Sequence, residues 1–341
     1  MDNEKEIAER LLGEKVLKIS AHDGGGNNNI FFVGTDTAEF ALKLYPKTDE
    51  CTRDRFHNEV SALQFFAHFY ATNEQKPLVP RFVAADKSSQ SAIMEWIKGE
   101  QPTPNAHNIS LLNDFINQLK MISNDPETKF SSHATEACLS GQELQNQLEK
   151  RLHDLIDPTI IHSPRDFLLN DVKVLQDQYL HKAKSLIAGN WAKDIDSSYH
   201  ILSPSDLGFH NAIQRPNGQI SFLDFEYFGW DDPVKLICDT CWHPGMSLST
   251  NYIKTLVKNS KRSFENDPTF NQRMIAYYPL FGLRWIYIIL AIFRPDKWLR
   301  SQKAGCVDSW DNMRSLQLQK AQNIFQRIEK ESKMVGFLFN E

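Results

Sequence analysis

The residues best suited to chemistry are two aspartates and an asparagine in the second half of the chain. Asp206 and Asn211 stand five positions apart in a loop-like segment, SPSDLGFHN. Asp224 comes thirteen positions after Asn211, behind a turn at 216–218 and an apolar run at 220–223. Phosphoryl transfer needs one carboxylate that faces the acceptor hydroxyl, plus an asparagine and a second carboxylate that hold Mg²⁺. The spacing predicts this chemistry; the alternative is a solvated loop, a hairpin and an aspartate at a strand end.

A lysine and a glutamate near the N-terminus could complete such a site. Lys43 lies in the alternating, strand-like segment 39–45, on the face opposite the large aliphatic residues. Glu59 follows sixteen residues later, within a helical pattern at 51–70, and could reach back to orient the lysine. Without that contact, Lys43 would be a solvated strand residue and Glu59 an exposed helix acid.

A run of small residues lies between the first two predicted strands, at 15–21 and 30–33. Glycine and asparagine permit positive φ angles and close approach of the backbone to a ligand. The run therefore indicates a hairpin that covers phosphates, or else a plain turn. The residues that we assign to it are Gly24, Gly25, Gly26 and Asn27.

The elements around these residues predict an α+β protein with two lobes. A helix at 4–13 and the helix at 51–70 accompany five strands, at 15–21, 30–33, 39–45, 80–85 and 91–97. Residues 98–104 mark a change in composition that suits a hinge. We therefore expect an N-terminal lobe at 1–98 and a larger, mostly helical lobe at 99–341. Its helices are predicted at 110–123, 140–157, 163–189, 233–242, 249–265, 269–294 and 308–332.

Length and charge restrict the class of protein. A chain of 341 residues exceeds one usual core. The net charge of -5 argues against a nucleic-acid partner. The apolar window 275–293 contains Pro279, Gly282 and Arg284, so we interpret it as a buried helix rather than a membrane span.

The five cysteines are scattered. The pair Cys238 and Cys241 has no second pair that would complete a zinc site. This usage fits a reducing compartment, and we expect a cytoplasmic protein.

Together these residues resemble the aminoglycoside phosphotransferase and choline kinase-like family, the small-molecule branch of the protein-kinase-like fold. The matching elements follow the family order over about residues 15–245. They are the hairpin 24–29, Lys43 in FALKLY, Glu59 in RFHNEVSAL, the hinge strand IMEWIKGE, Asp206 with Asn211, and FLDFEYFGWDDP. The resemblance implies a small lobe with a five-stranded antiparallel sheet and one main helix, beside a larger helical lobe.

The resemblance also implies ATP and Mg²⁺ as cofactors and a role for each residue. Lys43, oriented by Glu59, contacts the phosphates, and the backbone of Glu95, Trp96 and Ile97 holds the purine. Asn211 and Asp224 are the metal ligands, and Asp206 is the catalytic base. The apolar residues that we expect to cover the purine ring are Ile19, Ile30, Ala41 and Leu223.

The acceptor is less well defined. Aromatic rings and carboxylates after Asp224 suit either a cationic small molecule or ordinary core packing. Our acceptor-side candidates are Glu226, Tyr227, Trp230, Asp231 and Trp242. No oligomeric state is predicted.

One departure from the family stands next to the catalytic aspartate. The family has His-Gly before this residue, whereas this chain has Pro204 and Ser205. Pro204 could stiffen the turn by fixing φ, and His210 could brace the loop or simply be packed. A nucleotide-binding regulatory protein without transfer is therefore one alternative. A protein kinase is another, although no long activation segment follows Asp224. GTP in place of ATP also remains open.

Overall fold

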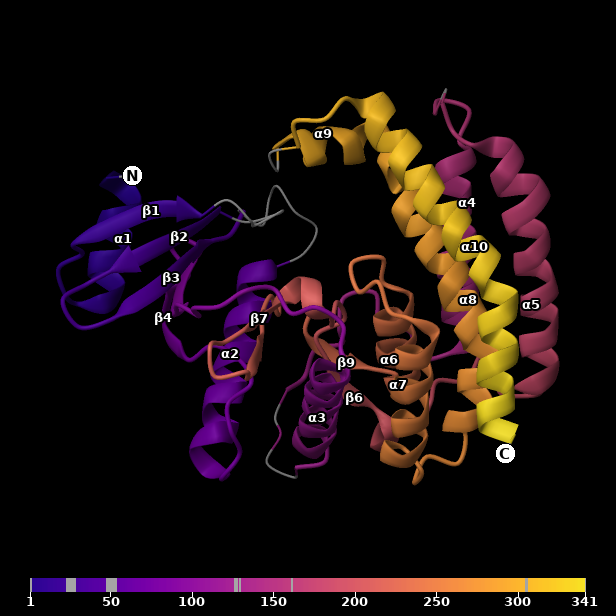
Figure 1. Ribbon diagram of the computed structural model, residues 1–341, viewed down its shortest axis with the longest axis horizontal. Coiled ribbons are helices and arrows are strands. Elements are labelled where there is room, and N and C mark those ends of the chain that lie inside the picture. The colour runs from indigo at the N-terminus through magenta and orange to yellow at the C-terminus, as the bar shows by residue number, and fades with distance from the viewer. Residues whose placement is uncertain are drawn as a thin grey trace.

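The computed structural model describes residues 2–22, 29–46, 54–125, 128, 130–160, 162–303 and 306–340. It has two lobes, a small one built on a sheet and a larger helical one (Figure 1). This confirms the α+β class. The predicted glycine-rich run, Gly24, Gly25, Gly26 and Asn27, lies outside the described residues.

The small lobe is a five-stranded antiparallel sheet with the order β1-β2-β3-β5-β4. Its strands are β1 (Lys18–His22), β2 (Asn29–Gly34), β3 (Glu39–Leu44), β4 (Phe82–Asp86) and β5 (Ser91–Glu95). One face packs on α1 (Asp2–Leu12) through a small apolar core that includes Phe40 and Leu42. The opposite face, on which the alternation in β3 predicted Lys43, meets α2 (Arg55–Thr72).

The hinge is fastened to the large lobe by backbone pairing. Glu100 and Gln214 exchange two hydrogen bonds, of 3.2 and 2.8 Å. Gly99 permits this contact, because a Cβ there would lie 2.0 Å from the Gln214 carbonyl oxygen. Gln214 ends β7 (Ala212–Gln214), which pairs with β8 (Ile220–Phe222) in the predicted hairpin. The lobe boundary after residue 98 stays a prediction.

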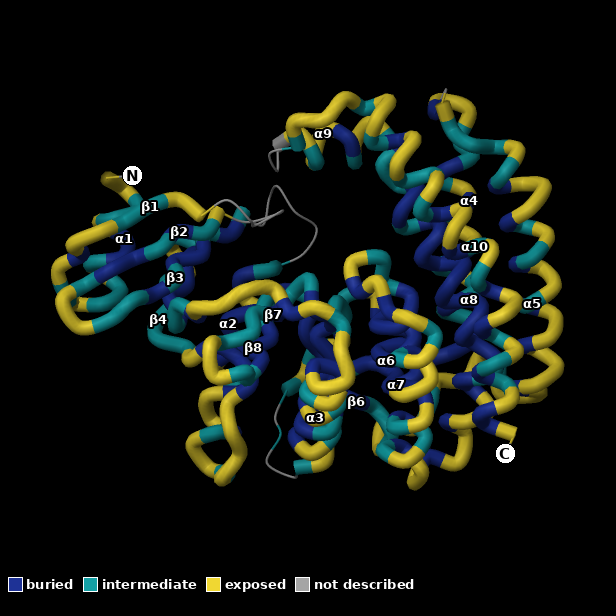
Figure 2. Tube along the Cα trace, viewed as in Figure 1, coloured by how far each residue is buried: buried dark blue, intermediate teal, exposed yellow. Residues whose placement is uncertain are grey.

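The large lobe is organised around one apolar helix, α8 (Phe270–Leu290). The helices packed against it are α4 (Gly141–Ile156), α5 (Lys173–Leu186), α6 (Pro233–Trp242) and α10 (Trp310–Asn340). Figure 2 shows α8 buried over most of its length. The stretch Phe270–Phe293 is long and apolar enough to cross a membrane, but 78% of its most apolar window is buried inside the protein. This agrees with the buried helix that we predicted.

The other helices follow the predicted order. They are α3 (Ala106–Ser123), α4 (Gly141–Ile156), α5 (Lys173–Leu186), α6 (Pro233–Trp242), α7 (Thr250–Ser263), α9 (Pro295–Lys303) and α10 (Trp310–Asn340). Helix α9 and the two short strands β6 (Ile201–Ser203) and β9 (Gly229–Asp231) were not predicted. Three-residue strands are too short to show a period of two.

The predicted helix 163–189 starts and ends close to its predicted bounds. It becomes helical at Arg165 and passes through a π-helix, Phe167–Val172, before α5, which ends at Leu186. The Ser163 hydroxyl donates to the carbonyl of Leu155 in the preceding helix.

Candidate active site

A buried lysine joins the two lobes. The Nζ of Lys43 lies 2.5 Å from Oε2 of Glu59 and 2.6 Å from Oδ1 of Asp224. Both Lys43 and Glu59 are buried, and the Tyr45 hydroxyl also donates to Glu59 at 2.9 Å. Burial acts to lower the pKa of Lys43, but Asp224 and Glu59 hold it above its usual value. The lysine is therefore a fixed positive charge in the cleft rather than a solvated strand residue.

The segment that carries Asp224 is held against the loop 206–211 and against α2. The Leu223 N–H donates to the Asn211 carbonyl at 2.8 Å, which places Asn211 and Asp224 side by side. Two residues on, Arg55 of α2 donates to Glu226 at 3.0 Å, and Asn58 donates to the Glu226 carbonyl at 3.1 Å. Asp224 itself has a φ of +63°.

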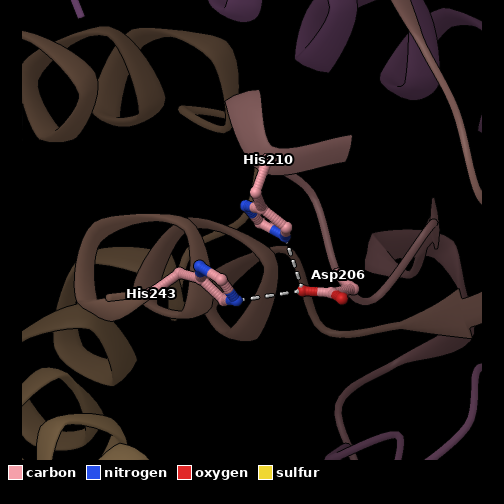
Figure 3. A group of neighbouring side chains, drawn as sticks. All are labelled: Asp206, His210 and His243. Atoms are coloured by element: carbon pink, nitrogen blue, oxygen red, sulfur yellow. Dashed lines mark hydrogen bonds and ion pairs between the residues drawn. The ribbon is translucent and has the colours of Figure 1, made fainter. Parts of the chain in front are cut away.

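Asp206 is surrounded by three hydrogen-bonding side chains. His210 Nε2 lies 3.0 Å and His243 Nε2 3.5 Å from its Oδ1 (Figure 3). Asn211 Nδ2 lies 3.3 Å from its Oδ2. Burial acts to raise the pKa of Asp206, but the hydrogen bond from His210 and the nearby His243 hold it below its usual range. A carboxylate that keeps its charge is suited to accept a proton from an acceptor hydroxyl.

The two histidine rings stack on each other, with centroids 3.7 Å apart and planes 8° from parallel. Gly208 makes room for this pair, since a Cβ there would lie 2.5 Å from the His210 ring. The Gly245 N–H donates to Nδ1 of His243, so Nε2 carries the hydrogen that faces Asp206. Burial, together with His210, lowers the pKa of His243 to about 4, so this ring is neutral at physiological pH.

Asp206, His210 and His243 offer three ligand atoms within 4.8 Å of one another, a spacing compatible with a metal ion. The stacked rings do not suit one. A histidine nitrogen binds a metal near the plane of its ring, and an ion between two parallel planes would lie far outside both. We therefore assign the group as hydrogen-bond donors around a carboxylate.

A cavity of about 630 Å³ lies between the lobes, next to these residues. Of the predicted site residues, its lining includes Lys43, Glu59, Glu95, Trp96, Ile97, Asn211 and Asp224. Ile30, Ala41 and Leu223 also line it, as predicted for apolar covers, and His22 and His210 were not predicted there. Ile19 was the wrong choice, because it packs on the α1 face of the sheet.

The hinge backbone is partly engaged in the sheet. The Glu95 N–H donates to the Arg81 carbonyl at 2.9 Å, and the Trp96 N–H donates to the Glu39 carbonyl at 3.3 Å. The Ile97 N–H has no acceptor among the described residues, which leaves it for a ligand in the cavity. The Glu95 side chain is bound by Arg215 at 2.8 Å and tightens the hinge.

The acceptor-side candidates are largely structural. Glu226, Asp231 and Trp242 are buried. Glu226 is paired with Arg55, Asp231 with Lys235 at 2.9 Å, and the Trp242 indole donates to the Tyr278 carbonyl. These contacts give each side chain a role in the core and remove it from contact with an acceptor in this conformation.

The two remaining candidates are partly exposed. Tyr227 accepts a backbone hydrogen bond from Thr135, and the Trp230 indole donates to the Phe130 carbonyl at 2.6 Å. Neither lines the cavity between the lobes.

Three residues that the sequence did not point to contact the site residues or the residues next to them: His243, Arg55 and Lys235. His243 follows α6 and reaches Asp206 across 37 positions, a separation at which no periodic pattern gives a signal. The partners of the loop 206–211 can be identified only when the fold is known, because they are remote in the sequence.

A lysine–glutamate pair under a five-stranded sheet, facing an Asp/Asn/Asp set across a cleft, defines a phosphotransferase of the kinase type. Residues 18–257 match the model of the phosphotransferase enzyme family, and the chain belongs to that family. It is a small-molecule phosphotransferase with the kinase-like fold. The sequence matches no curated protein.

Solved structures share the fold over nearly the whole chain. The choline kinase LicA from Streptococcus pneumoniae is 15% identical with a TM-score of 0.58, covering 96% of this chain and 99% of that one. A putative aminoglycoside phosphotransferase from Ralstonia eutropha is 12% identical, with a TM-score of 0.59 and coverage of 97% and 98%. The amicoumacin kinase hAmiN, in complex with AMP-PNP and Ca²⁺, is 11% identical, with a TM-score of 0.58 and coverage of 94% and 92%.

Proposed function

We propose that this protein transfers the γ-phosphate of ATP to a hydroxyl group of a small molecule, with Mg²⁺ as the metal. The observation that carries the proposal is the contact of Lys43 with both Glu59 and Asp224, at the edge of the cavity between the lobes. This arrangement puts a fixed cation and a carboxylate where phosphates and a metal would meet.

The donor set fits Mg²⁺. Asn211 uses its Nδ2 to bind Asp206, which leaves its side-chain oxygen as a ligand atom. Asp224 is about one third exposed and gives only Oδ1 to Lys43, so its other oxygen is open. Hard cations prefer such oxygen ligands. When bound, Mg²⁺ would neutralise charge on the phosphate oxygens.

Each residue of the proposed site then has a defined role. Lys43 binds phosphate oxygens and is oriented by Glu59. The Ile97 N–H and its hinge neighbours receive the purine. Asp206, held by His210, His243 and Asn211, accepts the hydrogen bond of the acceptor hydroxyl and takes its proton as the new bond forms. Positioning and charge stabilisation supply most of the rate in such reactions.

The acceptor is proposed only as a small hydroxyl-bearing compound. A cationic acceptor was suggested by the acids that follow Asp224, but those acids are already neutralised. Asp231 is paired with Lys235, Asp232 with Arg273 at 2.9 Å, and Asp239 with Arg284 at 3.2 Å. The acceptor therefore has no free carboxylate among these three to bind an ammonium group. A cytoplasmic location stays a prediction.

The test is a screen for phosphate transfer from ATP with Mg²⁺, using panels of hydroxylated amines, neutral sugars, nucleosides and hydroxy acids. Transfer to one panel that is lost in Asp206→Asn supports the proposal. Nucleotide binding without transfer to any panel, and without ATP hydrolysis, would instead indicate a regulatory protein. The same assay with GTP decides between the purines.

A further inference from the structure

The residue immediately before Asp206 has an uncommon backbone conformation. Ser205 has a φ of +65°, in the left-handed region. A residue with a Cβ adopts this region only at a cost in free energy, whereas glycine adopts it freely. Something in the surrounding structure must offset that cost, because the direction of Asp206 depends on it.

Three hydrogen bonds from three different segments hold Ser205. Its hydroxyl accepts from Lys235 Nζ at 3.0 Å and donates to the Thr135 carbonyl at 3.2 Å. Its N–H donates to the Ser203 hydroxyl at 3.0 Å. A hydrogen bond from a charged donor is stronger than one between neutral groups, so the Lys235 contact offsets the strain.

Lys235 is itself held rigidly. It lies in α6 with only 1% of its surface exposed, and forms ion pairs with Asp231 at 2.9 Å and Asp239 at 3.1 Å. Burial acts to lower the pKa of Lys235, but the two carboxylates hold it above its usual value, so the charge persists. Because the two carboxylates hold the Lys235 ammonium in place, its hydrogen bond anchors the Ser205 hydroxyl at a defined position.

The anchor is built on the strands that lead into the catalytic loop. Asp231 pairs with Ile201 across β9 and β6, and β6 ends at Ser203, two residues before Ser205. Figure 1 shows β6 and β9 side by side next to α6. One cluster thus connects the end of β6, the start of α6 and the turn that presents Asp206.

We propose that Lys235 is a positioning residue that acts through the Ser205 hydroxyl to hold Asp206 in its reactive orientation. The inference rests on the proposed function, in which Asp206 is the base. It assigns a functional task to a buried ion cluster that touches neither the nucleotide cavity nor the acceptor hydroxyl.

The decisive experiment compares Ser205→Ala with Ser205→Gly, two variants that both lack the hydroxyl and differ by one methyl group. The readout is hydrolysis of Mg-ATP with water as acceptor. We expect kcat of S205A to fall roughly 5- to 30-fold with KM for ATP unchanged, since alanine keeps the strain and loses the anchor. S205G should stay within about three-fold of the wild type, because glycine needs no anchor.

Equal activity of S205A, S205G and the wild type would overturn the inference. Equal loss in both variants would also overturn it, because the hydroxyl would then act in some way other than by holding Ser205 in its left-handed conformation.

Lys235→Met tests the source of the anchor. We expect it to lower kcat in the wild-type background and to have at least about five-fold less effect in the S205G background, since the two residues act in one unit. Equal effects in both backgrounds would show that Lys235 does not act through Ser205. Circular dichroism checks the fold of K235M, which leaves the buried Asp231 without its cation, whereas Asp239 keeps Arg284. If it does not fold, the S205A and S205G comparison decides alone.

Failure of the proposed function would be seen separately. If the wild type neither hydrolyses ATP nor transfers phosphate, Asp206 is not a base in this protein. Thermal unfolding then still tests the anchor, with S205A expected to melt below S205G.

Discussion

The Nζ of Lys43, on a strand of the small lobe, lies 2.6 Å from Oδ1 of Asp224 in the large lobe. This contact connects the two halves of the site, and Glu59 holds the lysine from the other side. The geometry makes the pair sensitive both to loss of charge and to a change in the shape of the cation.

Replacement of Lys43 by methionine should lower kcat/KM for ATP at least about 100-fold, because the phosphates lose their fixed cation. It should also destabilise the fold, since Glu59 is left buried without its partner. Lys43→Arg is the matched control, which keeps the charge. Steady-state kinetics and thermal unfolding measure the two effects. Wild-type kinetics in K43M would remove this lysine from the proposed site.

Substitutions of Asp206 and of Asp224 should affect different steps, phosphate transfer and ATP binding respectively. Asp206→Asn keeps the hydrogen-bonding shape but accepts no proton, so transfer should fall roughly 10²- to 10⁴-fold while ATP binding is kept. Asp224→Ala should instead weaken binding of ATP in the presence of Mg²⁺. Calorimetric titration of each variant with ATP, with and without Mg²⁺, distinguishes these two effects. The assignment fails if D206N transfers phosphate normally.

Arg55 and Glu226 should be strongly coupled. Glu226 is fully buried, and loss of one member of a buried ion pair typically costs about 3–5 kcal/mol. We expect Arg55→Met to destabilise by that amount and to raise KM for ATP, because α2 carries Glu59. The double variant Arg55→Met with Glu226→Gln should cost less than the sum of the single variants.

The matched control for this cycle is the exposed pair Lys173 and Asp177, whose removal should cost less than about 1 kcal/mol. Additive effects at Arg55 and Glu226, measured by urea unfolding, would contradict the coupling.

His243 should make the stability of the protein depend on pH. Its pKa is about 4 in the folded state and 6.5 in the unfolded chain. Between these values only the unfolded state takes up a proton, so the free energy of unfolding falls as pH decreases from 6.5 to 4, by roughly 3 kcal/mol at most. Above pH 6.5 and below pH 4 this contribution is constant.

His243→Gln is the control, because the glutamine Nε2 takes the place of the histidine Nε2 that faces Asp206, but glutamine does not titrate in this range. Urea unfolding at several pH values should show a smaller slope for H243Q than for the wild type. An identical slope in both proteins would exclude His243 as its source.

The small lobe could largely be predicted from the sequence, because its signals are local. Alternation in β3 separated Lys43 from Phe40 and Leu42, and the structure shows these two apolar side chains on the α1 face and the lysine on the other. The hairpin before Asp224 and the helix at α6 were also predicted, since a proline and glycine turn and an Asp-Pro start are strong short-range patterns.

Burial and partner choice could not be predicted in the same way. Asp231 and Trp242 looked like cleft residues, because aromatic and acidic types occur both at binding surfaces and in polar cores. Glu226 pairs with Arg55, which lies 171 positions away in the sequence, and only the packing of α2 on the large lobe brings the two side chains together.

The sequence by itself thus determined which groups could do the chemistry: Lys43, Glu59, Asp206, Asn211 and Asp224, each recognisable by residue type and spacing. Only the tertiary structure decided how they are held. Ser205 in its left-handed turn, Lys235 beneath it and His243 beside Asp206 belong to segments that are remote in the chain. Their contacts depend on how strands and helices pack, and no local pattern encodes that packing.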